Sequence, residues 1–381
     1  MVTAEFIKQY RDADVLTLAL QRNRYPEVDI DFALQQIEGY QRTRDKLPTL
    51  SNIEGWLFPP RLNIEQCSSE ATAQFKASLV QGDTLADLTG GYGIDTYFLS
   101  QHFRHTDYVE QNTQLEQIAD HNFRLTQRDI CVHNALSQDF LEAMPKVDCI
   151  YLDPARRGRA GQKVVRLEDC QPNVVELYPQ LRQHCDILLL KLSPICDIDV
   201  ALRSLPDAEA VYVVESNGEV KELLVLCRFT NTRPVTITAV QLTKADAPHT
   251  FTFAPAEEHT AAPHLATQLG QYLYEPAPSI LKAGAFKTVG NRYHIAKLAT
   301  NTHLYTAEQY IPDFRGRVFR IVSAAQKKEL QHRQLNIITR NYPQDIVALR
   351  RSLRIKEGGN DYLIATRLGA QPLLILAQRL Q

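Results

Sequence analysis

Apolar residues in the first 80 positions recur at helical spacing. The recurring positions are Phe6, Tyr10, Leu16, Leu20, Phe32, Leu34 and Ile37. Steps of three or four residues without strand alternation predict helices. Pro59 and Pro60 end one helix, and Ser68 or Ser69 can cap the next one, which we expect to begin at Glu70. The pattern predicts a helical N-terminal segment over 1–82.

From residue 83 onward, short apolar runs alternate with helical patterns. The runs are "TLADLTG" (84–90), "DYVEQ" (107–111), "DICVHNA" (129–135), "VDCIYLD" (147–153) and "DILLLKL" (186–192). Such alternation is typical of a parallel sheet built from βαβ units. Two more runs, 208–216 and 222–229, flank "NGEVK", which is a hairpin signal. We predict an α/β fold over 83–245, a Rossmann-like sheet of five parallel strands with a terminal hairpin.

The remaining chain reads as a strand, a connection and two small units. A strand-like run, "VTITAVQL" (235–242), is followed by a stretch rich in Ala, Pro, Thr and His that we interpret as an inter-domain connection. Residues 270–312 suggest a small helix–strand unit. Residues 313–381 predict strands at 317–324, 336–341, 361–368 and 372–380, with helices at 326–335 and 343–353. This last unit is a small α+β domain of βαβαββ order.

Charge is distributed unevenly along a chain whose formal net charge is only −2. Residues 83–230 carry 14 basic and 23 acidic residues, whereas residues 311–381 carry 13 basic and 5 acidic ones. The basic end can offer a positive face to phosphate, although a solvated arginine-rich helix explains it equally well. Either way, the chain has an acidic middle and a basic C-terminal domain.

Cysteine usage and the N-terminal residues bear on metal binding and compartment. The seven cysteines show no CxxC spacing, so we expect reduced thiols, with no disulfide framework and no metal site. The first 15 residues lack the basic and apolar regions of a signal peptide, and no run reaches 18 apolar residues. We expect a cytoplasmic protein that does not enter a membrane.

A glycine-rich turn follows the first predicted strand, and acidic residues follow the next two. "LADLTGGYGID" places Asp87 and Thr89 before Gly90, Gly91 and Gly93 and opens a helix, an arrangement that lets the backbone approach a ligand. Glu110 ends the second strand, where a carboxylate accepts ribose hydroxyls. Asp139 and Phe140, beyond the third strand, suit an adenine. We therefore predict cofactor binding by the residues Asp87, Thr89, Gly90, Gly91, Gly93, Glu110, Asp139 and Phe140.

This combination resembles the class I S-adenosylmethionine-dependent methyltransferases, which place an acid before the glycine loop and Asp or Asn followed by Pro after the fourth strand. Here Asp153 and Pro154 occupy that place, so the resemblance assigns them to the acceptor site. The second proline and the aromatic residue of the amine-modifying members are replaced by Ala155 and Arg156. The stacking partner of a flipped base must then come from elsewhere, or be an arginine plane.

"DPARRG" also resembles the "DPPRxG" of RNA uridine C5-methyltransferases, whose nucleophile is a cysteine after the fifth strand. Cys196 lies in a comparable place, but the serine that directly precedes the cysteine in that family is absent. Arg156 and Arg157 can contact phosphate at the mouth of the site, or lie in a solvated loop.

The glycine loop, "YVEQN", "YLDPARRG" and "EPAPSILKAGAF" together resemble a bacterial family of class I methyltransferases over nearly the full length. That family carries a small ferredoxin-like insert and a THUMP-like C-terminal domain. The resemblance implies S-adenosylmethionine as cofactor and RNA as partner, with transfer to a base nitrogen of tRNA or rRNA. In the basic domain Arg350, Arg351 and Arg354 are candidates for RNA contact. Uridine C5-methylation through Cys196, a protein or small-molecule acceptor, and a non-catalytic RNA-binding module are the alternatives.

Overall fold

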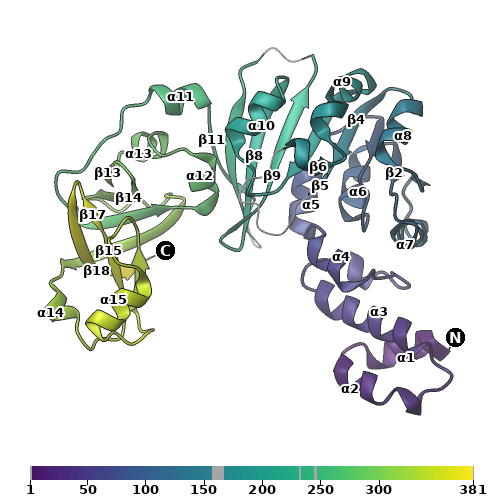
Figure 1. The fold of residues 1–381 in the computed structure, drawn as a ribbon, viewed down its shortest axis with the longest axis horizontal. Helices are drawn as coiled ribbons and strands as arrows, with labels where there is room; N and C mark the ends of the chain where they lie inside the picture. The colour runs from purple at the N-terminus through teal and green to yellow at the C-terminus, as the bar shows by residue number, and fades with distance from the viewer. Residues whose placement is uncertain (1, 157–166, 231–232, 244–246, 381) are drawn as a thin grey trace. The chain divides into compact units, whose positions relative to one another are not determined.

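The computed structural model describes residues 2–156, 167–230, 233–243 and 247–380. The chain forms two compact units, one of residues 1–209 and 223–233 and the other of residues 210–222 and 234–381. Figure 1 shows the course of the chain through both units, which we describe one at a time. No helix in the described ranges combines the length and the apolar character that crossing a membrane requires.

The first unit begins with a helical segment. Its helices are α1 (Val2–Tyr10), α2 (Val15–Leu20), α3 (Ile30–Thr43), α4 (Arg61–Gln66) and α5 (Glu70–Ala77). Phe6 and Ile37 lie in a common core, but Leu16 and Leu20 are 75% and 88% exposed. Ser69 accepts a hydrogen bond from the Thr72 N–H and caps α5. The predicted helical segment is confirmed, although two of its apolar positions face solvent.

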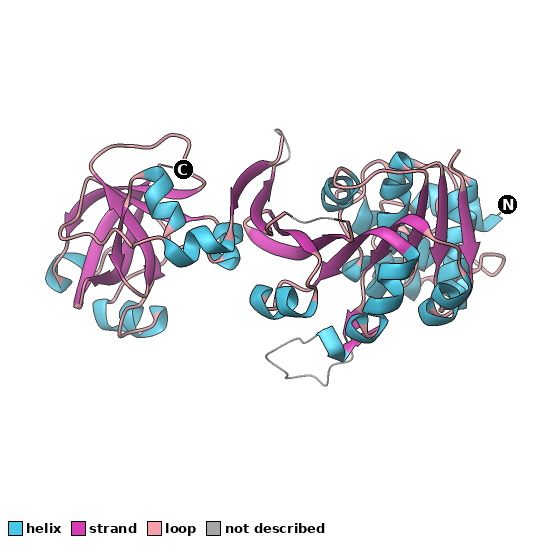
Figure 2. Cartoon of the chain, turned by 90° about the horizontal axis from the view of Figure 1, so that it is seen from above, coloured by secondary structure: helices cyan, strands magenta, loops and turns pink. Residues whose placement is uncertain are grey.

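Six strands of the first unit lie in the order β9-β7-β4-β1-β2-β3. They are β1 (Thr84–Asp87), β2 (His105–Val109), β3 (Ile130–His133), β4 (Val147–Leu152), β7 (Cys185–Leu192) and the antiparallel β9 (Glu219–Arg228). The intervening helices are α6 (Ile94–Leu99), α7 (Thr113–Arg124), α8 (Ser137–Ala143), α9 (Val174–His184) and α10 (Ile198–Ser204). Figure 2 shows helices along both sides of these strands. The predicted fold class, five parallel strands with an antiparallel addition, is confirmed.

The order of the parallel strands determines where a ligand can bind. β1 lies between β4 and β2, so the chain changes direction across the sheet at β1 and β4. In open α/β sheets the crevice outside the carboxyl ends of the strands at such a point is the usual ligand site. Asp87 ends β1 and Asp153 follows β4, so both lie at this edge. Two short strands, β5 (Ala155–Arg156) and β6 (Cys170–Gln171), pair beyond β4.

The second unit contains two groups of strands. The first is β8 (Ala208–Ser216), β10 (Thr236–Leu242) and β11 (His249–Phe253), in the order β11-β10-β8, followed by α11 (Pro255–Thr260). We expected only a connection after residue 242, and this was partly wrong. "HTFTF" alternates, and its Phe251 and Phe253 are buried, so a strand forms where composition suggested a linker.

The second group is a seven-stranded sheet with the order β13-β14-β12-β15-β18-β17-β16. Its strands are β12 (Tyr272–Pro276), β13 (Ala296–Ala299), β14 (Thr302–Ala307), β15 (Gly316–Ala324), β16 (Asn336–Thr339), β17 (Asp361–Leu368) and β18 (Gln371–Arg379). Its helices are α12 (Pro278–Ala283), α13 (Thr288–Tyr293), α14 (Lys327–Leu330) and α15 (Ile346–Leu353). From residue 316 onward the predicted βαβαββ order is present. α14 is shorter than predicted because the chain leaves the helix before His332, whose φ is 63°.

Candidate functional site

The glycine loop joins β1 to α6, and its three glycines have different surroundings. A Cβ on Gly90 would lie 2.1 Å from the Tyr108 ring, and one on Gly93, at φ 81°, would lie 2.7 Å from the Phe123 ring. Gly91 also has a positive φ, 55°, but the nearest atom to its Cβ position is a backbone oxygen 3.9 Å away. Gly90 and Gly93 therefore permit close packing. At Gly91 the positive φ, and not a close neighbour, favours glycine.

Glu110 follows β2 and is fixed against this loop. The Gly91 N–H donates to Oε2 of Glu110 at 2.8 Å, and the Asn112 N–H donates to Oε1 at 2.7 Å. The Tyr108 hydroxyl donates to the Gly91 carbonyl at 2.5 Å. Each carboxylate oxygen keeps capacity for a second hydrogen bond. The loop and Glu110 therefore lie together at this sheet edge, and the ribose-binding role of Glu110 stays a prediction.

Asp87 lies beneath the loop rather than on its surface. Its Oδ1 accepts from the Thr89 N–H at 2.9 Å, and its Oδ2 accepts from the Thr96 hydroxyl at 2.6 Å. Burial raises the pKa of Asp87 to about 7, against the lowering effect of these two hydrogen bonds. Asp87 shapes the loop from below, and its charge state changes near neutral pH.

Asp153 is connected to the same loop through Thr89. The Asp153 N–H donates to the Thr89 hydroxyl oxygen at 2.6 Å, and the Thr89 N–H binds Asp87. The Asp153 side chain is 38% exposed, and its Oδ2 accepts from Lys191 Nζ at 2.5 Å. Pro154, which follows it, is buried. Thr89 therefore links Asp87, which is predicted to bind the cofactor, to Asp153, which is predicted to bind the methyl acceptor.

A chain of alternating charges extends from Asp153 into the interior. Lys191 Nζ also lies 3.9 Å from Oδ2 of Asp95, and Lys76 Nζ lies 3.3 Å from its Oδ1. Ser68 and Tyr151 donate hydroxyl hydrogen bonds to the same carboxylate. Burial alone would raise the pKa of Asp95, but the two lysines outweigh it and lower the pKa.

Sequence reasoning missed this chain of charges. The available signals were a lysine inside the apolar run "DILLLKL" and a lysine on the buried side of α5. A charged residue in such a place is nearly always paired. Its partner cannot be read from spacing, because Lys76, Asp95 and Lys191 come from three different elements.

Asp139 and Phe140 lie on α8 rather than at the end of β3. Asp139 is exposed in the first turn of the helix, and Phe140 packs against His133 with ring centroids 4.6 Å apart. Ser137, which the sequence analysis did not select, donates to the Leu88 carbonyl at 2.6 Å. This bond brings the start of α8 to the end of β1. The adenine role of Asp139 and Phe140 stays a prediction.

Comparison with known proteins places the chain in a family. Residues 272–314 match a ferredoxin-like domain family, and residues 316–379 match a THUMP domain-like family. A crystal structure of a "putative methyltransferase" from Porphyromonas gingivalis W83 is 30% identical, with a TM-score of 0.88, over 100% of this chain and 98% of that chain. The chain belongs to the same family. The predicted family, with its ferredoxin-like and THUMP-like parts, is confirmed.

Two further solved structures match less than half of the chain. A "putative methyltransferase" from Streptococcus mutans in complex with SAH is 13% identical, covering 41% of this chain and 95% of that one, with a TM-score of 0.31. TrmK of M. capricolum in complex with SAH is 10% identical, covering 42% and 68%, with a TM-score of 0.33. None of the curated proteins matches the chain.

The arginines predicted to contact RNA lie in two places in this methyltransferase-family chain. Arg156 is in β5, and Arg157 falls outside the described residues. Arg350 and Arg351 are in the last turn of α15, and Arg354 follows it with φ 52°. Arg350 pairs with Glu357 at 3.1 Å, whereas among the described residues no ion pair reaches Arg351 or Arg354.

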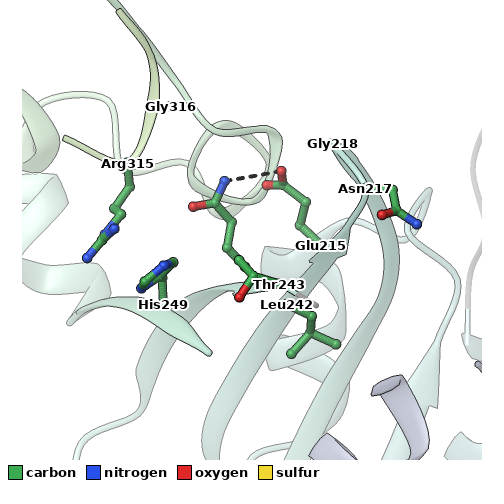
Figure 3. A pocket seen from close by; sticks show the side chains of 9 residues that line it. Glu215, Asn217, Gly218, Leu242, Thr243, His249, Arg315 and Gly316 are labelled. Carbon is green, nitrogen blue, oxygen red and sulfur yellow. Dashed lines mark hydrogen bonds between the residues drawn. The ribbon is translucent and has the colours of Figure 1, made fainter. Parts of the chain in front are cut away.

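Two further features of this family member bear on its chemistry. Cys196, the alternative nucleophile, is 1% exposed, so its thiol is not accessible to a substrate in this conformation. The second unit contains a polar cavity of about 410 Å³ beside the turn that follows β8. Gln241 Nε2 donates to Glu215 Oε1 at 3.4 Å on the wall of this cavity, and Figure 3 shows Glu215, His249 and Arg315 lining it. Glu215 Oε2 accepts from the buried Ser279 N–H at 2.8 Å, which gives this carboxylate a structural partner.

Proposed function

We propose that this protein is an S-adenosylmethionine-dependent methyltransferase that transfers a methyl group to a base nitrogen of tRNA or rRNA. The observation that carries the proposal is a set of hydrogen bonds at one edge of the sheet. Gly91 of the glycine loop bonds to Glu110, and Thr89 of the same loop bonds to both Asp87 and Asp153. These bonds join a ribose-binding carboxylate to a half-exposed acceptor carboxylate. The family membership supports methyl transfer independently of this geometry.

The cofactor, when bound, supplies a methyl group that its sulfonium sulfur has already activated. The protein's task is then to hold the acceptor nitrogen in line with that methyl group. Glu110, which the Gly91 N–H holds in place, binds the ribose hydroxyls. Thr89 keeps this side at a fixed distance from Asp153.

Asp153 orients the acceptor. Lys191 occupies Oδ2, and among the described residues no group bonds to Oδ1. That oxygen can accept a hydrogen bond from an exocyclic amine or a ring N–H and so direct the nitrogen lone pair. Lys191 prevents the carboxylate from rotating, which makes it a positioning residue rather than a catalytic one.

The RNA part of the proposal rests on the second unit. The THUMP-like residues 316–379 lie within the basic end of the chain, and Arg351 and Arg354 are exposed there. Exposed guanidinium groups bind the phosphates of structured RNA. We assign residues 83–245 to the methyltransferase domain and residues 313–381 to the RNA-presenting domain, with 1–82 and 270–312 as the helical and ferredoxin-like parts.

Two measurements test the proposal. Calorimetry with S-adenosylmethionine should show binding by the intact protein and at least tenfold weaker binding by Glu110→Ala, which removes the ribose acceptor. Labelled cofactor should then transfer its methyl group to total tRNA or rRNA, and nucleoside mass spectrometry should identify one methylated species.

The outcomes separate the alternatives. Transfer to protein or small molecules but not to RNA would overturn the RNA substrate. RNA binding without transfer would favour a non-catalytic module, and loss of transfer in Cys196→Ser with wild-type stability would favour uridine C5 chemistry. Binding of neither cofactor nor RNA would overturn the proposed function altogether.

A further inference from the structure

One face of the β2–β3 pair carries several side chains that can ligate a metal ion. The parallel register places Asp107 opposite Cys131 and Val109 opposite His133. Because side chains alternate along a strand, these four point to one face. The other face is apolar, where Tyr108 packs against α7. Asp107, Cys131 and His133 therefore share one face of the strand pair, on which the neighbouring Val109 is buried.

The three possible ligands lie close together. One ligand atom from each of Asp107, Cys131 and His133 lies within 4.8 Å of the others, and His133 Nε2 is 2.7 Å from Asp107 Oδ1. In a tetrahedral zinc site, bonds of about 2.0–2.3 Å place neighbouring ligand atoms about 3.3–3.8 Å apart. Shifts of about 1 Å in side-chain position would thus close the site. Cys131 is exposed, so an ion can enter from solvent.

The electrostatic surroundings favour a cation. The negative charges of Asp107 and Asp129 both act on the Cys131 thiol. Asp129 is itself bonded to His105, at 2.5 Å, near the start of the same two strands. A divalent ion would offset both carboxylate charges and stabilise the thiolate. Sulfur and imidazole nitrogen select ions of the zinc class over Mg²⁺ or Ca²⁺.

We propose that Asp107, Cys131 and His133 form a binding site for a zinc-class divalent cation, with the remaining coordination position open to water. The ion would join β2 to the edge strand β3 close to their carboxyl ends. There the Glu110 N–H donates to the His133 carbonyl at 3.1 Å. Occupancy would therefore stiffen the backbone that carries Glu110. The proposal stands on these three side chains and does not depend on methyl transfer.

Cobalt titration of the untagged, metal-free full-length protein tests the site. We expect one equivalent of Co²⁺ to bind with a thiolate-to-cobalt charge-transfer band, and Zn²⁺ to displace it. Cys131→Ser should abolish the band, and Asp107→Asn and His133→Gln should each weaken binding at least about tenfold, since even outer-shell changes cost 10–100-fold. Cys67→Ser is the control, because Cys67 is the one other cysteine that is not buried. It should leave the titration unchanged.

A second readout separates loss of the site from loss of the fold. Zn²⁺ should raise the melting temperature of the wild-type protein and of Cys67→Ser, and should not raise that of Cys131→Ser or Asp107→Asn. These variants change half-buried or exposed side chains and should retain the metal-free melting temperature. A charge-transfer band that survives in Cys131→Ser, or no band in the wild-type protein, would overturn the proposal.

Discussion

Asp153 and Glu275 are two carboxylates paired with cations, yet they differ in what they leave free. Arg340 lies 2.7 Å from Oε1 of Glu275, and Arg317 pairs with its Oε2. The Glu275 side chain is only 4% exposed, whereas Asp153 is 38% exposed and pairs with Lys191 through Oδ2 alone. Asp153 lies in "YLDPARRG" and Glu275 in "EPAPSILKAGAF", two of the stretches on which the sequence resemblance rests.

The difference distinguishes a structural charge from one that is available for chemistry. Two arginines use both oxygens of Glu275, so this carboxylate joins β12 to β15 and to the residue after β16. Asp153 is fixed on one side, and among the described residues no group bonds to its other carboxylate oxygen. Pairing that is complete indicates a role in stability, and pairing that is half complete at an exposed sheet edge indicates a role in function.

The sharpest test of this comparison is Asp153→Ala, because Asn at this position would keep a side-chain oxygen that can accept the same hydrogen bond. We expect kcat for methyl transfer to fall by about 10²–10³-fold, as when one oriented hydrogen-bonding group of an active site is removed. Affinity for S-adenosylmethionine and the melting temperature should stay close to wild type, because the Thr89 bond uses the backbone of residue 153. Steady-state kinetics with saturating cofactor measure the effect. If the variant kept more than about a tenth of the wild-type kcat, the proposal that Asp153 orients the acceptor would be wrong.

Asp87 extends the comparison to a carboxylate with no cationic partner among the described residues. Its pKa is raised from 3.8 to about 7, so the folded protein holds a proton that the unfolded chain has lost between these values. Stability relative to the neutral variant Asp87→Asn is therefore greatest at low pH and falls as pH rises through 7. We expect a relative loss of about 2–3 kcal/mol between pH 5 and pH 8.

Urea unfolding of both proteins across this pH range measures the effect. The difference between wild type and Asp87→Asn should level off above pH 8, where Asp87 is ionised in both states. A difference that stays constant from pH 5 to pH 8 would mean that Asp87 titrates normally despite its burial.

Glu275→Gln tests the other half of the comparison. Removal of the charge weakens the ion pair with Arg317 and the hydrogen bond from Arg340, whose side chains are 36% and 43% exposed and can turn to water. We expect a loss of about 2 kcal/mol in the free energy of unfolding, the usual contribution of a hydrogen bond to a charged group. kcat of the folded protein should be unchanged. A normal stability with a reduced kcat would reverse the roles that we give to Glu275 and Asp153.

Sequence patterns predicted which residues lie at the sheet edge far better than they predicted which charged side chains form ion pairs there. The glycine loop, Glu110 and Asp153 could be found because each follows a short apolar strand, and parallel strands bring their carboxyl ends together. Lys191 and Asp95, or Glu275 and Arg340, meet only after the chain has folded, and no local spacing links them. Long-range ion pairs depend on tertiary packing. Unlike helices and strands, they leave no periodic pattern in a single sequence.

Two local predictions failed for related reasons. β11 was interpreted as part of a connection. A strand of only five residues gives a weak alternation signal within a stretch rich in Pro, Ala and Thr. α14 was predicted too long, because a helical pattern does not reveal that the chain turns at His332, whose N–H donates to the Leu353 carbonyl. Tertiary contacts decide both cases against local preference.

The smallest expected effect is on tRNA binding by arginines. As for the carboxylates, we expect the arginines without an ion-pair partner to be the ones that bind a ligand. In the described part of the chain Arg351 and Arg354 have no carboxylate partner, whereas Arg333 pairs with Asp361 at 3.1 Å. Arg351→Ala combined with Arg354→Ala should weaken tRNA binding about tenfold at low salt. The slope of log K against log [salt] should fall by about 1.4–1.8 in magnitude, because each of the two lost phosphate contacts removes about 0.7–0.9. Arg333→Ala should leave both quantities near wild type. Equal losses in the two variants would show that pairing inside the fold does not decide which arginines reach RNA.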